Sequence, residues 1–294
     1  MEEFIKPTVL LIGSKGQLGS ELKALLAESD KYNSIYVDRT LFPLEELEHI
    51  QERLSRFSPQ FIINAAAYTA VDKAEEEFEL ANLINHLAVK EMAIYAERAS
   101  CHLISISTDY VFDGHNTSPW KEDDPVNPIN VYGKTKALGE MAIMQENPNA
   151  IILRTSWVYS SYGSNFVKTM LRLMASKEEL SIVDDQVGSP TYAKDLALCI
   201  ISMLDSKIWV PGIYHYANEG HLSWFNFAAA IKEEIKFDCM LKPVPSSAYE
   251  TAAERPKYSV LDKSKIKSTF GIQIPHWETS LKNMLADWTS KTGL

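Results

Sequence analysis

The sequence has little of what several classes of protein require. Its 294 residues include three cysteines, Cys101, Cys199 and Cys239, which are far apart and odd in number, so we predict no disulfide framework and expect each to be a small buried side chain. No Lys/Arg-rich run occurs and the formal net charge is −10, which argues against a nucleic-acid partner. No apolar stretch approaches the roughly 20 residues that span a bilayer. The segment Met1–Pro7 lacks the basic start and apolar core of a signal peptide, so we expect a cytoplasmic protein with no membrane partner.

The composition is that of an ordinary globular protein, with 46% hydrophobic and 23% charged residues. Short aliphatic runs alternate with helical apolar periodicity through about residue 155, which predicts an α/β fold with a doubly wound, Rossmann-like parallel sheet. The predicted strands are Thr8–Ile12, Ile35–Val37, Phe61–Ile63, Leu103–Ile106 and Ile151–Leu153. The predicted helices are Leu18–Leu26, Pro43–Phe57, Leu80–Ala99 and Tyr132–Gln145.

Beyond that point the alternation loosens. Helical patterns over Phe166–Met174 and Lys194–Leu204 flank a loop, and a strand-like Ile213–Tyr216 precedes further helices at Trp224–Ile235 and Glu278–Trp288. We predict an NAD(P)-binding domain over residues 1–160 plus about 192–217. A smaller carboxyl-terminal substrate-binding domain is predicted over about 161–191 and 218–294.

Three glycines follow the first predicted strand at a spacing typical of dinucleotide-binding loops. Gly13, Gly16 and Gly19 form G-x-x-G-x-x-G between that strand and the first predicted helix. Such glycines allow a tight turn, close approach of a pyrophosphate, and close packing of helix on strand. Free N–H groups at the helix start attract phosphate. The placement favours a bound nucleotide over a glycine-rich turn that holds no ligand.

The end of the second predicted strand leaves the choice of nucleotide open. Asp38 there is suited to accept hydrogen bonds from the adenosine ribose, which favours NAD. The neighbouring Arg39 is suited to pair with a 2′-phosphate, which favours NADP. A third interpretation is that Asp38 and Arg39 form only a charge pair on the surface.

Two residues of one predicted helix and one strand-end hydroxyl form a candidate redox site. Tyr132 and Lys136 lie four residues apart and therefore on one helix face. The unperturbed pKa of a tyrosine is about 10, and we expect the Lys136 ammonium to lower the pKa of Tyr132 toward neutrality. Thr108 lies just past the end of the fourth predicted strand, where a doubly wound sheet meets its ligand, and we expect it to hydrogen-bond a substrate oxygen and the Tyr132 hydroxyl.

Together these motifs resemble the extended short-chain dehydrogenase/reductase superfamily and, within it, the dTDP-4-dehydrorhamnose reductase family. The resemblance covers nearly the whole chain. Its segments are Gly13–Gly19, Asn64–Glu75, Ser107–Gly114, Val131–Lys136, Arg154–Tyr159, Asn165–Arg172, Asp185–Thr191 and Arg255-Pro256. It implies NAD(P)H-dependent reduction of the C4 ketone of dTDP-4-dehydro-L-rhamnose to dTDP-L-rhamnose, a precursor of cell-surface polysaccharide. It also implies that Tyr132 protonates the developing alkoxide and that Lys136 and Thr108 adjust the acidity of Tyr132.

The resemblance also places ligand contacts. It gives cofactor contacts to Gly16, Gln17, Leu18, Asp38, Ala67, Tyr68 and Thr69. We add Gly13, Gly19, Arg39, Leu44, Ala66, Tyr132 and Lys136 as expected cofactor-binding residues. Sugar contacts are implied for Thr108, Asp109 and Trp157, and we add Tyr110. Lys168, Arg172 and Arg255 are further candidates for the nucleotide diphosphate, because cationic groups suit phosphate, although each is equally suited to a solvated surface.

The chain departs from the family's pattern at two places. Pro43-Leu44 stands where the family commonly has an acidic and then an aliphatic residue near the adenine. Some relatives dimerise through acidic side chains around Mg²⁺, but Lys194 occupies one matching position and its ammonium would repel a metal, while Glu21 alone is too little to rebuild the site. We therefore expect no metal-linked dimer, and either a monomer or a weak homodimer.

Two other functions compete with this interpretation. A nucleotide-sugar 4,6-dehydratase or epimerase of the same superfamily is one; the dehydratase needs an acid–base pair after the catalytic threonine, typically Asp then Glu, whereas this chain has Asp109-Tyr110. A non-catalytic, dinucleotide-binding regulatory subunit is the other, and the presence of Tyr132, Lys136, Thr108 and Trp157 argues against it.

Overall fold

The structure is a computed structural model that describes residues 6–292. Residues 1–5, which make up most of the segment that argued against a signal peptide, lie outside this range. Within 6–292, no helix is both long and apolar enough to cross a membrane.

A six-stranded sheet forms the centre of the larger lobe. Its order is β10-β5-β4-β3-β1-β2, and every pairing in it is parallel. The strands are β1 (Thr8–Ile12), β2 (Asn33–Val37), β3 (Phe61–Asn64), β4 (His102–Thr108), β5 (Ile151–Thr155) and β10 (Gly212–His215). The expected doubly wound parallel sheet is therefore confirmed. The chain reverses its direction of travel across the sheet between β1 and β3, and ligands of such sheets bind at that point, beyond the carboxyl ends of the strands.

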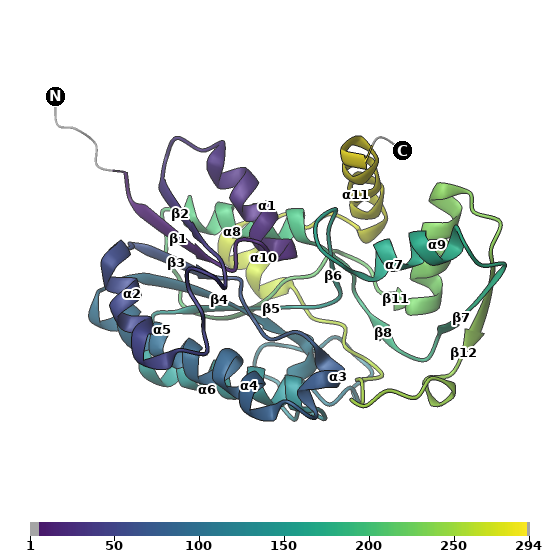
Figure 1. Cartoon of the computed structure of the whole chain (residues 1–294), viewed down its shortest axis with the longest axis horizontal. Helices are drawn as coiled ribbons and strands as arrows, with labels where there is room; N and C mark the ends of the chain where they lie inside the picture. The colour runs from purple at the N-terminus through teal and green to yellow at the C-terminus, as the bar shows by residue number, and fades with distance from the viewer. Residues whose placement is uncertain (1–5, 293–294) are drawn as a thin grey trace.

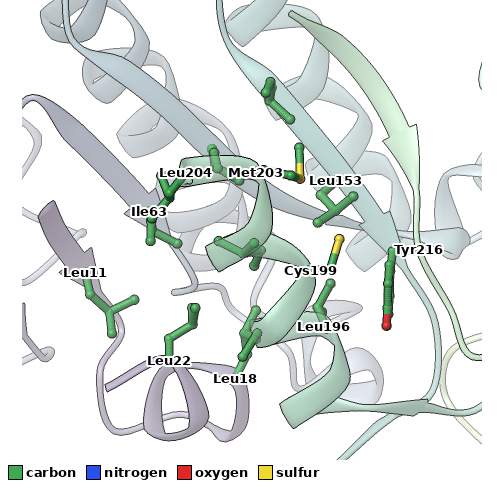
Figure 2. Packing of buried hydrophobic residues seen from close by; sticks show 14 of the residues in the cluster. Leu11, Leu18, Leu22, Ile63, Leu153, Leu196, Cys199, Met203, Leu204 and Tyr216 are labelled. Atoms are coloured by element: carbon green, nitrogen blue, oxygen red, sulfur yellow. The ribbon is translucent and has the colours of Figure 1, made fainter. Parts of the chain in front are cut away.

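Helices cover both faces of this sheet (Figure 1). α1 (Gln17–Ala27), α8 (Ala193–Leu204) and α10 (Ser264–Phe270) lie on one face, and α2 (Ile50–Phe57), α5 (Ala88–Arg98) and α6 (Val131–Glu146) lie on the other. Successive strand residues point to opposite faces, so Val9 and Leu11 join the first cluster while Leu10 and Ile12 join the second. Figure 2 shows the first cluster, where Leu18 and Leu22 of α1 meet side chains of α8.

A smaller lobe has its own apolar cluster at the other end of the molecule (Figure 1). Its main elements are α7 (Phe166–Met174), β7 (Glu179–Val183), α9 (Trp224–Ile235), β12 (Met240–Val244) and α11 (Trp277–Thr292). The strands β7 and β12 pair in parallel. In contrast, α10 places Ile266 in the core of the larger lobe, so the carboxyl-terminal third of the chain contributes to both lobes.

Two predicted helices differ in detail from the structure. The helix expected to begin at Pro43 begins at Ile50, after a short 3-10 turn at Leu47–His49. Leu44 lies in a turn before it, where it is buried and lines the cavity described below. The helix expected over Leu80–Ala99 is formed by α4 (Phe78–Asn82), a π-helical turn and α5 in direct succession. The π-helical turn spans Leu83–Leu87.

Candidate active site

A cavity of about 880 Å³ lies at the carboxyl end of the sheet and is lined by both lobes. This volume is within the range of small-molecule and cofactor sites. It brings together most of the residues predicted to bind ligand. These are Gly13, Gly16, Gln17, Leu18, Asp38, Arg39, Leu44, Ala66, Ala67, Tyr68, Thr69, Thr108, Asp109, Tyr110, Tyr132, Lys136 and Trp157.

The glycine loop fits a dinucleotide pyrophosphate. Gly13 has φ +86°, and a Cβ there would lie 2.7 Å from the Ala66 nitrogen, so only glycine suits this turn. A Cβ on Gly19 would lie 2.0 Å from the Gly13 carbonyl oxygen; Gly19 does not line the cavity but allows α1 to pack closely on the loop. Gly16 caps α1 without a side-chain hydrogen bond, so no side chain occupies the place where a phosphate would meet the helix N-terminus.

Charged side chains gather where the adenosine ribose is expected. Asp38 accepts hydrogen bonds from the backbone of Thr40 at 2.9 Å and of Leu41 at 3.2 Å, and it forms an ion pair with Lys15. The Lys15 hydrogen bond is the main cause that holds the pKa of Asp38 below its usual value. Arg39 pairs with Glu45 at 2.7 Å. Lys15, which the sequence analysis did not single out, thus places a second cation beside Asp38 in addition to Arg39.

We expect Arg39→Ala to raise the KM for NADPH roughly tenfold and to change the KM for NADH much less. A charge-assisted hydrogen bond to phosphate contributes about 1.5 kcal/mol or more, which corresponds to this factor. Steady-state kinetics with each cofactor would measure it. Arg56→Ala is a matched control, because Arg56 pairs with Glu52 on the exposed face of α2. Equal losses for both cofactors would contradict a role in recognising the 2′-phosphate.

The start of α6 is fixed by backbone and capping contacts. Asn130 caps the helix by accepting a hydrogen bond from the Gly133 nitrogen at 2.8 Å. A Cβ on Gly133 would lie 2.1 Å from the Tyr110 carbonyl oxygen, so glycine lets α6 pack directly on the turn that follows β4. This packing sets Tyr132 beside Thr108, and a hydrogen bond from the Thr108 side chain acts to lower the pKa of Tyr132.

The electrostatics of Tyr132 and Lys136 differ from the expectation. Burial raises the pKa of Tyr132 to about 12; the Thr108 hydrogen bond opposes this rise and the charge of Asp109 adds to it. The predicted lowering toward neutrality is therefore wrong in direction. Lys136 donates from Nζ to the Ile106 carbonyl oxygen at 2.6 Å, and burial lowers the pKa of Lys136 to about 8. For both groups desolvation by burial is the largest cause of the shift in pKa.

A buried ion pair lies one helical turn beyond Lys136. Arg154 of β5 donates to Glu140 through Nε at 2.9 Å and through a terminal nitrogen at 2.7 Å, and both side chains are almost fully buried. Glu140 follows Lys136 by four residues, and its charge raises the pKa of Lys136 against the effect of burial.

The substrate side of the cavity is aromatic. Trp157 has φ +47°, and its ring stacks on that of Trp224 with centroids 3.4 Å apart and planes 8° apart. Gly188 makes room for it, because a Cβ there would lie 2.6 Å from the indole. Tyr110 meets Tyr132 edge to face at 5.8 Å. Trp224, from the first turn of α9, is a lining residue that the sequence analysis missed.

The three candidates for the diphosphate do not line the cavity. Lys168 donates to the carbonyl oxygens of Ser161 at 3.3 Å and of Gly163 at 2.7 Å. Arg172 is exposed on α7. Arg255 forms two hydrogen bonds with Asp72, at 2.9 and 2.6 Å. Their role in binding the diphosphate stays a prediction.

Two further residues support the cavity wall without being predicted. Asn85, in the π-helical turn, accepts from the Tyr68 nitrogen at 2.9 Å and donates to the Tyr68 carbonyl oxygen at 3.1 Å. Asn165 caps α7 and donates to Gln17 at 2.9 Å, which ties the glycine loop to the smaller lobe. An asparagine within an otherwise apolar helical pattern was the signal that could have identified Asn85.

Lys194 and Glu21, the two positions compared with relatives that dimerise around a metal, each contact another side chain of this chain. Lys194 pairs with Asp287 at 2.8 Å. Glu21 is buried and accepts a hydrogen bond from Ser160 at 2.5 Å.

The sequence matches the family described as RmlD substrate binding domain over residues 7–290. A dTDP-4-dehydrorhamnose reductase of Aggregatibacter actinomycetemcomitans is 41% identical in an alignment of 289 residues that covers 95% of this chain and 98% of that protein. The spore coat polysaccharide biosynthesis protein SpsK of Bacillus subtilis (strain 168) is 40% identical over 282 residues, which are 96% of this chain and 98% of that protein.

Solved structures agree with this similarity. The crystal structure of dTDP-4-dehydrorhamnose reductase from Bacillus anthracis str. Ames in complex with NADP has a TM-score of 0.91 and 36% sequence identity, and covers 96% of this chain and 100% of that chain. The Bordetella bronchiseptica enzyme WbmG in complex with NAD and UDP has a TM-score of 0.82 at 17% identity, covering 98% of this chain and 96% of that chain, which supports the fold alone.

Proposed function

Because this chain belongs to the RmlD substrate-binding-domain family, we propose that it is a dTDP-4-dehydrorhamnose reductase. It reduces the C4 ketone of dTDP-4-dehydro-L-rhamnose to dTDP-L-rhamnose with NADPH or NADH, and so supplies a precursor of cell-surface polysaccharide. The observation that carries the proposal is the meeting of the glycine loop, Thr108, Tyr132 and Lys136 in one cavity that extends to Trp157. The volume and the two-lobed lining suit a dinucleotide beside a nucleotide sugar.

The proposed chemistry assigns a proton step to Tyr132. A bound reduced nicotinamide supplies the hydride. Tyr132 carries a proton at neutral pH, since its pKa is raised to about 12, and donates it to the oxygen of the reduced carbon. Thr108 hydrogen-bonds the hydroxyl of Tyr132 and thereby orients it. We assign to Lys136, whose Nζ is held by the Ile106 carbonyl oxygen, the positive charge that stabilises the phenolate as it forms.

We also propose the surroundings in which this site acts. The sheet and its helices bind the cofactor, and the smaller lobe closes the substrate side through Trp224, which stacks on Trp157. The ammonium of Lys194, which pairs with Asp287 at 2.8 Å, would repel a metal at this position, so we propose a monomer or weak homodimer without a bridging metal. We propose the cytoplasm as its location.

The test is an assay that follows the absorbance of the reduced nicotinamide with the 4-keto nucleotide sugar and each cofactor in turn. Oxidation of the cofactor only when this sugar is present is the expected result. Cofactor binding without any turnover would instead support a regulatory subunit. Loss of water from a 4-hydroxy nucleotide sugar would support a dehydratase, which the presence of Tyr110 beside Asp109 argues against.

Lys136→Met is expected to weaken cofactor binding and to lower turnover together, each by roughly tenfold or more, and to shift the pH dependence of turnover. The substitution removes a buried ammonium that is expected to hold the ribose and to stabilise the phenolate. Equilibrium cofactor titration and steady-state kinetics would measure both effects. Lys134→Met is a matched control, because Lys134 is exposed on the same helix. An unchanged pH profile and affinity in Lys136→Met would mean that the Tyr/Lys spacing is coincidental.

A further inference from the structure

A chain of side-chain oxygens connects Tyr132 to a buried carboxyl group. The Thr108 hydroxyl hydrogen-bonds that of Tyr132, and Thr108 Oγ1 lies 3.0 Å from Asp109 Oδ1. The Tyr110 nitrogen donates to the same threonine oxygen at 3.2 Å, which fixes its position at the end of β4. The hydroxyl of Tyr132 is therefore linked through a single side chain to Asp109.

Asp109 is in a position where its neutral form is favoured. The residue is 2% exposed, and its Oδ2 is buried with no hydrogen-bond partner in the described part of the chain. An unpaired carboxylate oxygen away from water is costly when charged. Burial therefore raises the pKa of Asp109 to about 7, although the neighbouring side chains of Ser259 and Thr108 oppose the rise.

The groups around Asp109 supply little compensating charge. Tyr110 follows it in the chain, and Tyr132 faces it from α6. Both are neutral at pH 7, since a tyrosine pKa is ordinarily about 10 and burial raises the pKa of each further. Lys136 lines the same cavity from α6 but donates to Ile106. Beyond Tyr110, the charges of Arg255 and Asp72 are paired with each other.

We infer that Asp109 supplies, through Thr108, the proton that Tyr132 takes up in the same step in which Tyr132 protonates the substrate oxygen. The inference rests on the proposed reductase function and adds to it. Asp109 was expected only to contact the sugar. In this inference Asp109 is a proton store: its carboxyl group is held in position and passes its proton to Tyr132 through Thr108.

The proton transfers balance. The Tyr132 O–H bond breaks as an O–H bond forms on the C4 oxygen. The Thr108 O–H bond breaks as that of Tyr132 re-forms, and the Asp109 carboxyl O–H bond breaks as that of Thr108 re-forms. No atom in the relay is oxidised or reduced, and the resulting Asp109 carboxylate takes a proton from water when the product leaves.

The test is the single-turnover rate of cofactor oxidation as a function of pH. In the wild type the rate should fall as pH rises through the pKa of Asp109, because the carboxylic acid form is then lost. Asp109→Asn retains an oxygen that accepts from Thr108 but has no acidic proton. We expect it to lower the rate at low pH by roughly 10- to 100-fold, toward the lower end of general-acid effects. We also expect it to abolish this alkaline limb and to leave the KM for the sugar nearly unchanged.

A matched pair of variants tests the path through Thr108. Thr108→Val breaks the oxygen chain and should abolish the alkaline limb, whereas Thr108→Ser retains a hydroxyl and should keep it. Thermal unfolding would confirm that the variants are folded. A raised KM with an unchanged pH profile in Asp109→Asn would overturn the relay and leave Asp109 as a sugar ligand only.

A second readout is independent of activity. Carbon-13 NMR of aspartate-labelled protein without ligands should show one carboxyl group that titrates near neutral pH and disappears in Asp109→Asn. Titration of that carboxyl near pH 4 would overturn the inference. If the wild type titrates as expected but does not reduce the 4-keto sugar, the proposed function fails rather than the assignment of the proton store.

Discussion

Tyr132→Phe is expected to lower turnover by roughly 10²-fold or more while leaving the affinity for the reduced cofactor nearly unchanged. The substitution removes the hydroxyl group that donates the proton to the substrate oxygen in the proposed reaction. It retains the ring, which contacts Tyr110 edge to face at 5.8 Å, so the packing of α6 on the turn after β4 is preserved. The loss should therefore fall on the chemical step.

Cofactor titration and single-turnover kinetics on the same preparation would separate binding from chemistry. Tyr249→Phe serves as a control, because Tyr249 is 61% exposed and does not line the cavity. Turnover similar to that of the wild type in Tyr132→Phe would remove Tyr132 from the mechanism. A large loss of cofactor affinity would show instead that the hydroxyl mainly holds the nicotinamide half of the cofactor.

Arg154→Met is expected to have the largest effect on stability, about 3–5 kcal/mol of the free energy of unfolding. It leaves Glu140 buried without its two hydrogen bonds at 2.9 and 2.7 Å. The arginine also lies over the Phe112 ring, 5.0 Å from the centroid, so its removal loses packing as well as charge.

Chemical denaturation of the single and double variants would test this prediction. Arg154→Met combined with Glu140→Leu should regain much of the lost stability, because apolar side chains of similar volume often replace a buried ion pair at little cost. A loss below about 1 kcal/mol in Arg154→Met would be typical of an exposed pair, and would show that water reaches Glu140.

The larger lobe could be predicted from the sequence because its strands are buried on both faces. Continuous aliphatic runs such as Val9–Ile12 identify such strands without knowledge of their partners. The glycine loop could be predicted equally well, because the spacing of its glycines reflects local steric limits around Gly13 and Gly19. Local patterns of this kind determine local structure.

The remaining features depend on contacts between distant residues. The pairing of β7 with β12 is not encoded in either segment alone. The predicted helix start at Pro43 was wrong; Leu44 instead lies in a turn and is buried beside the cavity, a tertiary contact that apolar spacing does not reveal. The pKa of Tyr132 was predicted in the wrong direction because helical spacing gives the distance to Lys136 but not the burial of both groups. Arg255 suited a phosphate by its chemistry, but its pairing with Asp72 spans most of the sequence.

The order in which segments of the chain enter the two lobes affects how the protein folds during synthesis. Between β7 and β12 the polypeptide returns to the larger lobe to form α8 and β10. On a ribosome, the larger lobe can therefore assemble most of its sheet while β7 still lacks a neighbour, and chains generally fold from the amino terminus as they emerge. The substrate side of the enzyme is completed last, when synthesis is nearly finished.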